Sequence, residues 1–188
     1  MRVVFLGDSL IYGYGVRRKL SWVSLAAARL GIEAVNRGVN GDTTYGMYAR
    51  FDSDVLAWKP DAVFLMGGCN DVFTAGTADG ARAQMARMAA LARGHGIAPL
   101  VGTAIPLVPP AARRAWGPLT DFSHALAELE QYTAWLKRGG AGDGVPVCDF
   151  WTVFRGRTEA RYFPDGVHPT EEGHRWMAEA FCAFYRGL

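Results

Sequence analysis

The sequence predicts an α/β fold in which helices cover both faces of one open, parallel β-sheet. The first observation behind this prediction is a set of five short runs that are almost continuously apolar, as buried parallel strands are. The second is that segments with helical periodicity lie between these runs. The third is that half of the 188 residues are hydrophobic, enough for one sizeable core. We therefore expect a single domain over residues 1–188.

The five apolar runs are the predicted strands, and their alternation with helices fixes where a site should lie. Strand–helix–strand units cross over with one handedness and bring the carboxyl ends of all strands to the same edge of the sheet. Ligands of such sheets bind outside this edge. A candidate site residue should therefore come just after a strand. The predicted strands are Val3–Leu6, Ala34–Asn36, Ala62–Met66, Leu100–Ala104 and Val145–Asp149.

Apolar residues recur at steps of three and four in five segments, which predicts five amphipathic helices. The first follows Ser21, a residue type that caps helices, and stops at Gly31. The second is predicted as one continuous helix that ends before Pro60. The apolar stripes of the five helices are Trp22–Leu30, Met47–Trp58, Met85–Ala92, Phe122–Leu136 and Trp176–Phe184.

Charge and cysteine content argue against several classes of protein. A net charge of +2 gives no electrostatic case for binding nucleic acid or an anionic membrane surface. Three widely spaced cysteines, Cys69, Cys148 and Cys182, indicate neither a disulfide framework nor a zinc site. The apolar run at the N-terminus is too short for a signal peptide, and no stretch is long enough to span a bilayer. We therefore expect a cytoplasmic protein without a membrane anchor; the sequence indicates no oligomeric state.

Three residues with the chemistry of serine hydrolysis follow the first and last strands. Ser9 comes directly after the first strand, within Gly7–Leu10. Asp165 and His168 come after the fifth strand, within Asp165–Pro169. Serine hydrolysis needs an imidazole to take the hydroxyl proton and a carboxylate to orient that imidazole. An offset of three residues on a tight loop lets Asp165 reach His168. Each segment on its own also fits a turn or a helix start.

Two more residues after strands could stabilise an oxyanion. Asn70 follows the third strand, and its side-chain amide could donate to a developing negative charge. Gly41 follows the second strand, where a backbone N–H with no side chain in front of it suits the same purpose. Both segments are also typical of ordinary turns.

Other candidate residues fit structural roles better. Cys69 has no recognisable histidine partner and is expected to be a buried thiol. His95, His124 and His174 lack a carboxylate three residues earlier and are expected at the surface or at helix ends. The segment Pro106–Leu119 either walls a substrate pocket or forms an irregular connection, and both interpretations stay open.

The short segments that hold Ser9, Gly41, Asn70 and the Asp165–His168 pair are weak signals singly, but in this order along the chain they form a specific pattern. The sequence resembles the GDSL esterase/lipase family, also called the SGNH hydrolases, in blocks of the form G-D-S-L, N-G-D-T, G-G-x-N-D and D-x-x-H-P. The resemblance covers nearly the whole chain. The matching blocks here are Gly7–Leu10, Asn40–Thr43, Gly67–Asp71 and Asp165–Pro169.

The resemblance implies a flavodoxin-like three-layer α/β/α sandwich with a five-stranded parallel sheet. It implies that Ser9 is the nucleophile, that His168 acts as general base and then acid, and that Asp165 orients His168. It also implies an oxyanion hole made by the backbone N–H groups of Ser9 and Gly41 and the side-chain amide of Asn70. No cofactor or metal is implied. The substrate implied is a small-molecule carboxylic ester: a short-acyl ester, an acetylated sugar or a lysophospholipid-type compound.

Two other functions fit the sequence less well than ester hydrolysis does. A non-catalytic domain that binds a carbohydrate or a partner on the same fold would be expected to lack a member of the triad, and none is missing here. A flavodoxin-like nucleotide or flavin binder would need a loop that cradles phosphate after the first strand. Asp8 places an unfavourable charge in that loop.

Overall fold

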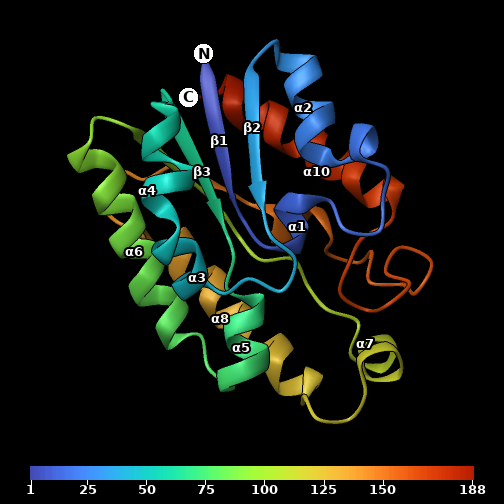
Figure 1. The fold of residues 1–188 in the computed structure, drawn as a ribbon. Helices are drawn as coiled ribbons and strands as arrows, with labels where there is room; N and C mark the ends of the chain where they lie inside the picture. The colour runs from blue at the N-terminus through green and yellow to red at the C-terminus, as the bar shows by residue number, and fades with distance from the viewer.

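The computed structural model describes residues 1–188 and contains one five-stranded sheet whose paired strands are all parallel, in the order β2-β1-β3-β4-β5. The predicted α/β fold is confirmed. All five predicted strands are present, and β1 lies between β2 and β3 (Figure 1). The strands are β1 (Arg2–Gly7), β2 (Glu33–Gly38), β3 (Ala62–Met66), β4 (Ala98–Gly102) and β5 (Val147–Cys148).

Helices cover both faces of this sheet. Figure 1 shows α2 and α10 on one side, while α3, α4, α6 and α8 lie on the other. The longer helices are α2 (Trp22–Leu30), α6 (Asp79–Gly94), α8 (Phe122–Lys137) and α10 (Glu171–Arg186). The shorter ones are α1 (Ser9–Tyr12), η1 (Arg18–Leu20), α3 (Thr44–Ala49), α4 (Phe51–Asp54), η2 (Leu56–Trp58), α5 (Cys69–Ala75), α7 (Pro109–Trp116) and α9 (Phe150–Val153).

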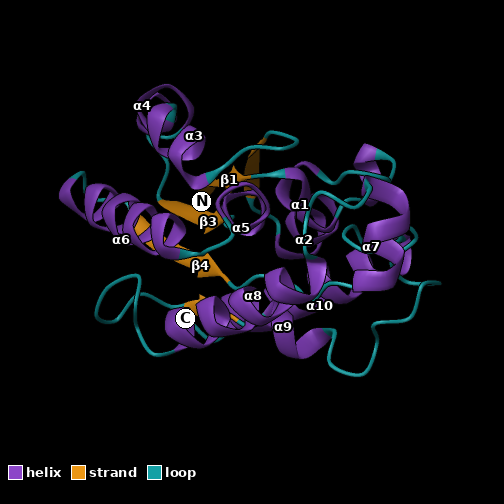
Figure 2. Cartoon of the chain, turned by 90° about the horizontal axis from the view of Figure 1, so that it is seen from below, coloured by secondary structure: helices purple, strands orange, loops and turns teal.

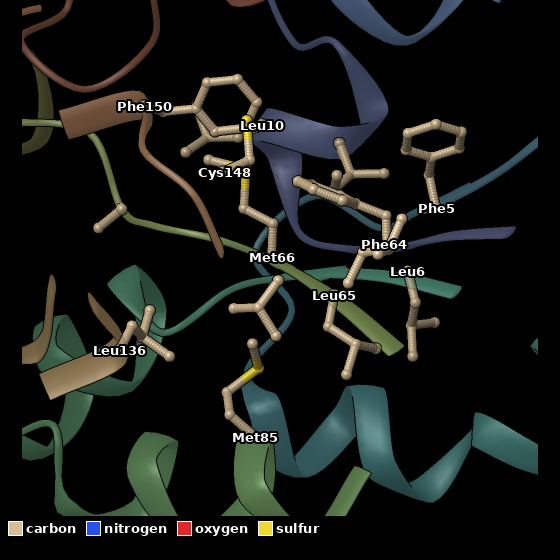
Figure 3. Close-up of a cluster of buried hydrophobic side chains, with 14 of the residues drawn as sticks. Phe5, Leu6, Leu10, Phe64, Leu65, Met66, Met85, Leu136, Cys148 and Phe150 are labelled. Atoms are coloured by element: carbon tan, nitrogen blue, oxygen red, sulfur yellow. The ribbon is translucent and has the colours of Figure 1, made fainter. Parts of the chain in front are cut away.

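Alternation along the two central strands fills both layers of the core. Phe5 points to the α2/α10 side, where its ring lies 5.3 Å from that of Phe181 and makes an edge contact with Trp22 at 5.5 Å. The next residue along the strand, Leu6, points to the opposite face (Figure 3). Met85 of α6, predicted as a core residue, lies on that opposite side with its side chain fully buried.

Two of the predicted strands end earlier than their apolar runs. The run that contains β4 continues to Ala104 and Ile105, but these residues have left the sheet, and Ile105 lines a cavity instead. Strand β5 has only two residues because Asp149 turns away from β4 and accepts a hydrogen bond from the N–H of Thr152 to cap α9. At both places the apolar run is longer than the strand that it contains.

The predicted continuous helix over residues 47–58 is wrong. The chain forms three short helices there, α3, α4 and η2, which are separated at Arg50 and Val55. Arg50 leaves helical geometry (φ −103°, ψ 11°), and its guanidinium turns toward the sheet edge. Met47 and Phe51 remain buried, so the apolar spacing is kept although the helix is broken.

Four elements that the apolar spacing did not predict gather at or near the carboxyl edge of the sheet. The four-residue helices α1 and α9 follow β1 and β5, α5 follows β3, and α7 lies in the connection after β4. Seen from below the sheet, α1 and α5 lie near one another, with α7 to one side (Figure 2). The segment Pro106–Leu119 is therefore largely helical, and not an irregular connection. None of the helices in the structure combines the length and the apolar character that crossing a bilayer requires.

Candidate active site

Ser9, His168 and Asp165 are joined in one line of hydrogen bonds. Ser9 is the first residue of α1, directly after β1, and its Oγ lies 2.8 Å from Nε2 of His168. On the other side of the imidazole, Nδ1 lies 2.6 Å from Oδ2 of Asp165. With the ring proton on Nδ1, His168 donates to the carboxylate and accepts from the serine hydroxyl. The three predicted residues are thus brought together although 156 residues separate Ser9 from Asp165.

The loop from Asp165 to His168 is shaped to hold both side chains. The second carboxylate oxygen of Asp165, Oδ1, accepts the backbone N–H groups of Val167 (2.9 Å) and His168 (2.7 Å). Gly166 between them has φ +78°, and a Cβ there would overlap the backbone of Ala112 in α7. Helix α7 therefore packs directly on this loop, which only glycine permits.

Asp165 is held in its ionised form. Burial would raise the pKa of its carboxyl, but the hydrogen bonds from the side chain and backbone of His168 and from the N–H of Val167 outweigh burial and lower it. A carboxylate at this position fixes the ring proton of His168 on Nδ1 and leaves Nε2 free to accept a proton.

Asn70 and Gly41 lie beside Ser9, as predicted from their positions after β3 and β2. Asn70 is the second residue of α5, and its Nδ2 donates to the carbonyl of Asp42 at 2.8 Å. Because an amide NH₂ group has two hydrogens, one bond orients the side chain and the second hydrogen stays available. Gly41, at φ +76°, has no heavy atom near its missing Cβ. Asn70, Gly41, Ser9 and His168 line the same cavity.

Arg50 braces the two loops that carry Ser9 and Gly41, and no sequence signal pointed to it. Its guanidinium donates to the carbonyl of Gly7 at 2.9 Å, two residues before Ser9. It also donates from Nε to the carboxylate of Asp42 at 2.8 Å. Only 18% of the Arg50 side chain is exposed, so these bonds are shielded from water. Asp42, which accepts from both Arg50 and Asn70, links the loops after β1, β2 and β3.

Asp71, in the third sequence block, also holds two loops of the site together, a role that the sequence did not predict. Its carboxylate accepts the hydroxyl of Thr44 at 2.6 Å and the N–H of the same residue at 3.0 Å. Both residues are buried. The bonds fasten the start of α3 to α5 and therefore keep Gly41 and Asn70 next to each other.

The buried carboxyl of Asp8 is the unusual charged group of the site. It is 1% exposed; Oδ1 accepts the N–H of Leu10 at 2.9 Å, and Oδ2 has no partner. Burial raises the pKa of Asp8 to about 6, against the effects of the Leu10 N–H and of His168. Asp8 therefore caps α1 at the cost of holding a poorly solvated carboxyl beside Ser9.

The cavity at Ser9 encloses about 520 Å³ and is apolar over most of its wall. Trp116, the last residue of α7, lines it and donates from its indole N–H to the carbonyl of Asp165 at 3.1 Å. The segment Pro106–Leu119 thus walls the cavity, which was one of its two open interpretations. Two aromatic rings flank the imidazole of His168: Tyr14 at 4.4 Å and Trp116 at 5.8 Å.

The remaining sequence candidates lie apart from this line of residues or take structural roles. Cys69 borders the cavity but is buried, and burial raises the pKa of its thiol, which disfavours the reactive thiolate. His95 and His124 are exposed, as expected. His174 is 1% exposed and so is not at the surface; its Nδ1 accepts the N–H of Trp22 at the start of α2, which fits the other expectation, a residue at a helix end. The structure has no group of three or more His, Cys, Asp or Glu placed to hold a metal ion.

Several known proteins are similar to this chain in sequence or in fold. An arylesterase of Vibrio mimicus is 26% identical over 183 residues, which cover 95% of this chain and 84% of the relative. An acetylxylan esterase of Geobacillus stearothermophilus is 50% identical over 44 residues, but these span only 23% of this chain and 20% of the relative. The solved structure of a member of the lipolytic protein G-D-S-L family from Veillonella parvula superposes with a TM-score of 0.83 over the full length of both chains at 22% identity, a likeness of fold.

The family model described as GDSL-like Lipase/Acylhydrolase matches residues 5–176, a range that holds Ser9, Gly41, Asn70, Asp165 and His168. The chain therefore belongs to the GDSL-like Lipase/Acylhydrolase family and, with it, to the serine hydrolases that act on ester bonds.

Proposed function

We propose that this chain hydrolyses a small-molecule carboxylic ester through a covalent acyl-enzyme formed on Ser9. The candidate substrates are a short-acyl ester, an acetylated sugar and a lysophospholipid-type compound. The observation that carries the proposal is the unbroken line from Ser9 Oγ to His168 (2.8 Å) and on to Asp165 (2.6 Å), which opens onto a cavity. Nucleophile, base and orienting carboxylate stand within hydrogen-bond reach, as nucleophilic catalysis requires.

In the first step His168 takes the hydroxyl proton on Nε2 while Ser9 Oγ attacks the ester carbonyl. Asp165 stabilises the imidazolium that forms and keeps its second proton on Nδ1. The imidazolium then passes its proton to the leaving alcohol, and the acyl group stays on Ser9. Water, deprotonated by the same imidazole, attacks the acyl-enzyme and releases the acid. The imidazolium then gives the proton that it took from water to Ser9 Oγ as the acyl–oxygen bond breaks, which closes the cycle.

Negative charge on the carbonyl oxygen is met by three donors: the backbone N–H groups of Ser9 and Gly41 and the free hydrogen of the Asn70 amide. Pre-oriented donors of this kind stabilise the tetrahedral intermediate without reorganisation. The bond from Asn70 to the carbonyl of Asp42 supports this role, because it fixes the amide plane.

The buried environment of Asp8 argues against the nucleotide-binding alternative. Its carboxyl lines the cavity, and one of its two oxygens has no hydrogen-bond partner. In its ionised form this carboxylate would repel a phosphate bound beside it. No lysine or arginine lines the cavity to offset that charge.

We also propose a cytoplasmic location. All three cysteines are free and buried, as expected for a chain kept under reducing conditions. Fractionation of cells that produce the full-length protein tests this: recovery with membranes or outside the cytoplasm would contradict it.

The function is tested by hydrolysis of p-nitrophenyl acetate, butyrate and octanoate by the wild type, by Ser9→Ala and by a matched variant, Ser24→Ala. Ser24 lies on α2 and does not line the cavity. We expect the wild type and Ser24→Ala to hydrolyse esters and Ser9→Ala to lose roughly 10⁴-fold or more in kcat. Equal rates for Ser9→Ala, or no hydrolysis of any ester by the wild type, would favour a binding domain on this fold.

A further inference from the structure

The cavity beside Ser9 has a mostly apolar wall. Besides Ser9, Gly41, Asn70 and His168, where the reaction is proposed to occur, most of its lining side chains are aliphatic or aromatic. Asp8 is its only carboxyl group, and no lysine or arginine borders it. The apolar wall is built from Leu10, Phe73, Ile105, Leu107, Trp116 and Phe122.

The interior is much larger than an acetyl group needs. At about 30 Å³ per non-hydrogen atom, the share of one water molecule in the liquid, an acetyl group takes roughly 90 Å³. The cavity encloses about 520 Å³. Water would have to fill the remainder against apolar walls, which is unfavourable. On the same basis, an acyl group of about eight carbons takes roughly 270 Å³ and covers much of the apolar wall.

The walls are fixed by contacts that do not depend on a ligand. The rings of Phe73 in α5 and Phe122 in α8 meet edge to face at 5.5 Å. Ile105 and Leu107 are buried on the opposite connection, at 1% and 2% exposure. Trp116 is tied to the Asp165 carbonyl by its indole N–H. The cavity is therefore a preformed feature of the fold, of the size at which pockets enclose organic ligands.

A second hollow, of about 370 Å³, also borders His168. It is bordered by Tyr14, Asp165, Thr170 and Glu171 as well as by the imidazole. Since His168 must hand its proton to the leaving oxygen, the alcohol half of the ester has to lie next to the imidazole. The apolar cavity is then left for the acyl half.

We propose that the preferred substrates are esters of a medium-length apolar acyl group with a small polar alcohol. The acyl chain lies in the apolar cavity and the alcohol lies in the hollow between Tyr14 and Glu171. This inference rests on the proposed esterase function and narrows its substrate class: it favours an uncharged acyl chain of about eight carbons or more over the acetyl group.

The acyl half is tested with p-nitrophenyl esters from acetate to dodecanoate, in which the leaving group is constant. Each added methylene that becomes buried is expected to raise kcat/KM about fourfold until the cavity is filled. A rise in kcat/KM from acetate through octanoate supports the proposal. Hydrolysis that is fastest with acetate, or that does not depend on acyl length, overturns the proposal while the esterase function stands. Absence of any Ser9-dependent hydrolysis overturns the function itself.

A pair of matched variants locates the chain in the cavity. Leu107 lines the cavity, and Leu107→Trp should fill part of it and move the optimum to shorter acyl groups. Leu119 is 99% exposed on the same connection and does not line the cavity, so Leu119→Trp should keep the wild-type optimum. Thermal unfolding of both variants reports whether they fold. An unchanged optimum in folded Leu107→Trp overturns the placement.

The orientation of the ester is tested with two isomers, methyl nonanoate and octyl acetate, which differ only in which half is apolar. We expect methyl nonanoate to be hydrolysed roughly 10³-fold faster, since about six extra methylenes are then buried on the acyl side at about fourfold each. Faster hydrolysis of octyl acetate would place the alcohol in the apolar cavity and overturn the assignment of the two hollows.

Discussion

The substitution Asp8→Asn tests whether the carboxyl beside Ser9 is held at a cost in stability. Asp8 is 1% exposed, with Oδ1 bonded to the N–H of Leu10 and Oδ2 without a partner. Asparagine keeps the oxygen that caps α1 but cannot ionise. The variant therefore removes the charge and preserves the local fold.

The size of the effect follows from the pKa. Burial raises the pKa of Asp8 from 3.8 to about 6 in the folded chain. Below pH 3.8 the carboxyl is protonated in both the folded and the unfolded chain. As the pH rises toward 6 the unfolded chain releases this proton first, so the free energy of unfolding falls through this window and stays lower above it. The difference between 3.8 and about 6 corresponds to about 3 kcal/mol at roughly 1.36 kcal/mol per pH unit.

We expect Asp8→Asn to gain up to about 3 kcal/mol relative to the wild type between about pH 4 and pH 8. Its buried amide hydrogen costs about the same at every pH, so the change with pH is the informative quantity. Urea unfolding followed by tryptophan fluorescence measures it. Asp121→Asn is the matched control, because Asp121 caps α8 in the same way but is exposed. A difference between Asp8→Asn and wild type that does not change with pH would refute the reasoning.

Three further predictions concern other residues around the site. Burial lowers the pKa of His174 from 6.5 to about 4, so the unfolded chain binds this proton first and the wild type loses about 3 kcal/mol of unfolding free energy as the pH falls through this range. His174→Gln is expected to abolish this pH-dependent loss. Unfolding midpoints across this window measure that slope, and an identical slope in wild type and variant would count against it. Asn70→Ala is expected to lower kcat roughly 10²–10³-fold in steady-state ester hydrolysis, and wild-type turnover would remove Asn70 from the oxyanion hole. Arg50→Met is expected to lower kcat about tenfold or more by loosening the two loops that it braces. Arg2→Met, which breaks similar bonds at the opposite end of β1, should leave kcat unchanged, and equal losses in kcat for both variants would show that Arg50 has no special role.

The site residues could be predicted because each lies in a short local block directly after a strand. Parallel strands with one-handed crossovers bring their carboxyl ends to one edge, so Ser9, Gly41 and Asn70 had to lie near each other once the strands were identified. The pairing of Asp165 with His168 is also local, because a three-residue loop is enough to join them.

What could not be predicted depends on contacts between distant parts of the chain. Arg50 interrupts the predicted helix, and its guanidinium donates hydrogen bonds to Gly7 and Asp42. The spacing of apolar residues does not predict such bonds. His174 lies three and seven residues before the buried Met177 and Phe181 of α10, but its bond with the N–H of Trp22, 152 residues away, could not be read from that spacing.

Short helices were missed for a related reason. Helices such as α1 and α7 are too short for apolar periodicity to show, and they are stabilised by what they pack against. Helix α7 lies on the glycine of the Asp165 loop, so its position depends on the site itself. The strand predicted over Leu100–Ala104 ends two residues too late for a similar reason: Thr103 and Ala104 are buried although β4 ends at Gly102, and a buried loop needs the same kind of side chain as a buried strand.

The central claim is that Ser9 is the nucleophile and carries a covalent intermediate. Its most direct test is labelling with diethyl p-nitrophenyl phosphate, which transfers a stable phosphoryl group to an activated serine, followed by intact-protein and peptide mass spectrometry. We predict one adduct per wild-type chain, located on Ser9, released together with one equivalent of p-nitrophenol and accompanied by loss of ester hydrolysis; Ser9→Ala should take up none. An adduct on another residue, or ester hydrolysis that persists unchanged in Ser9→Ala, would contradict the account.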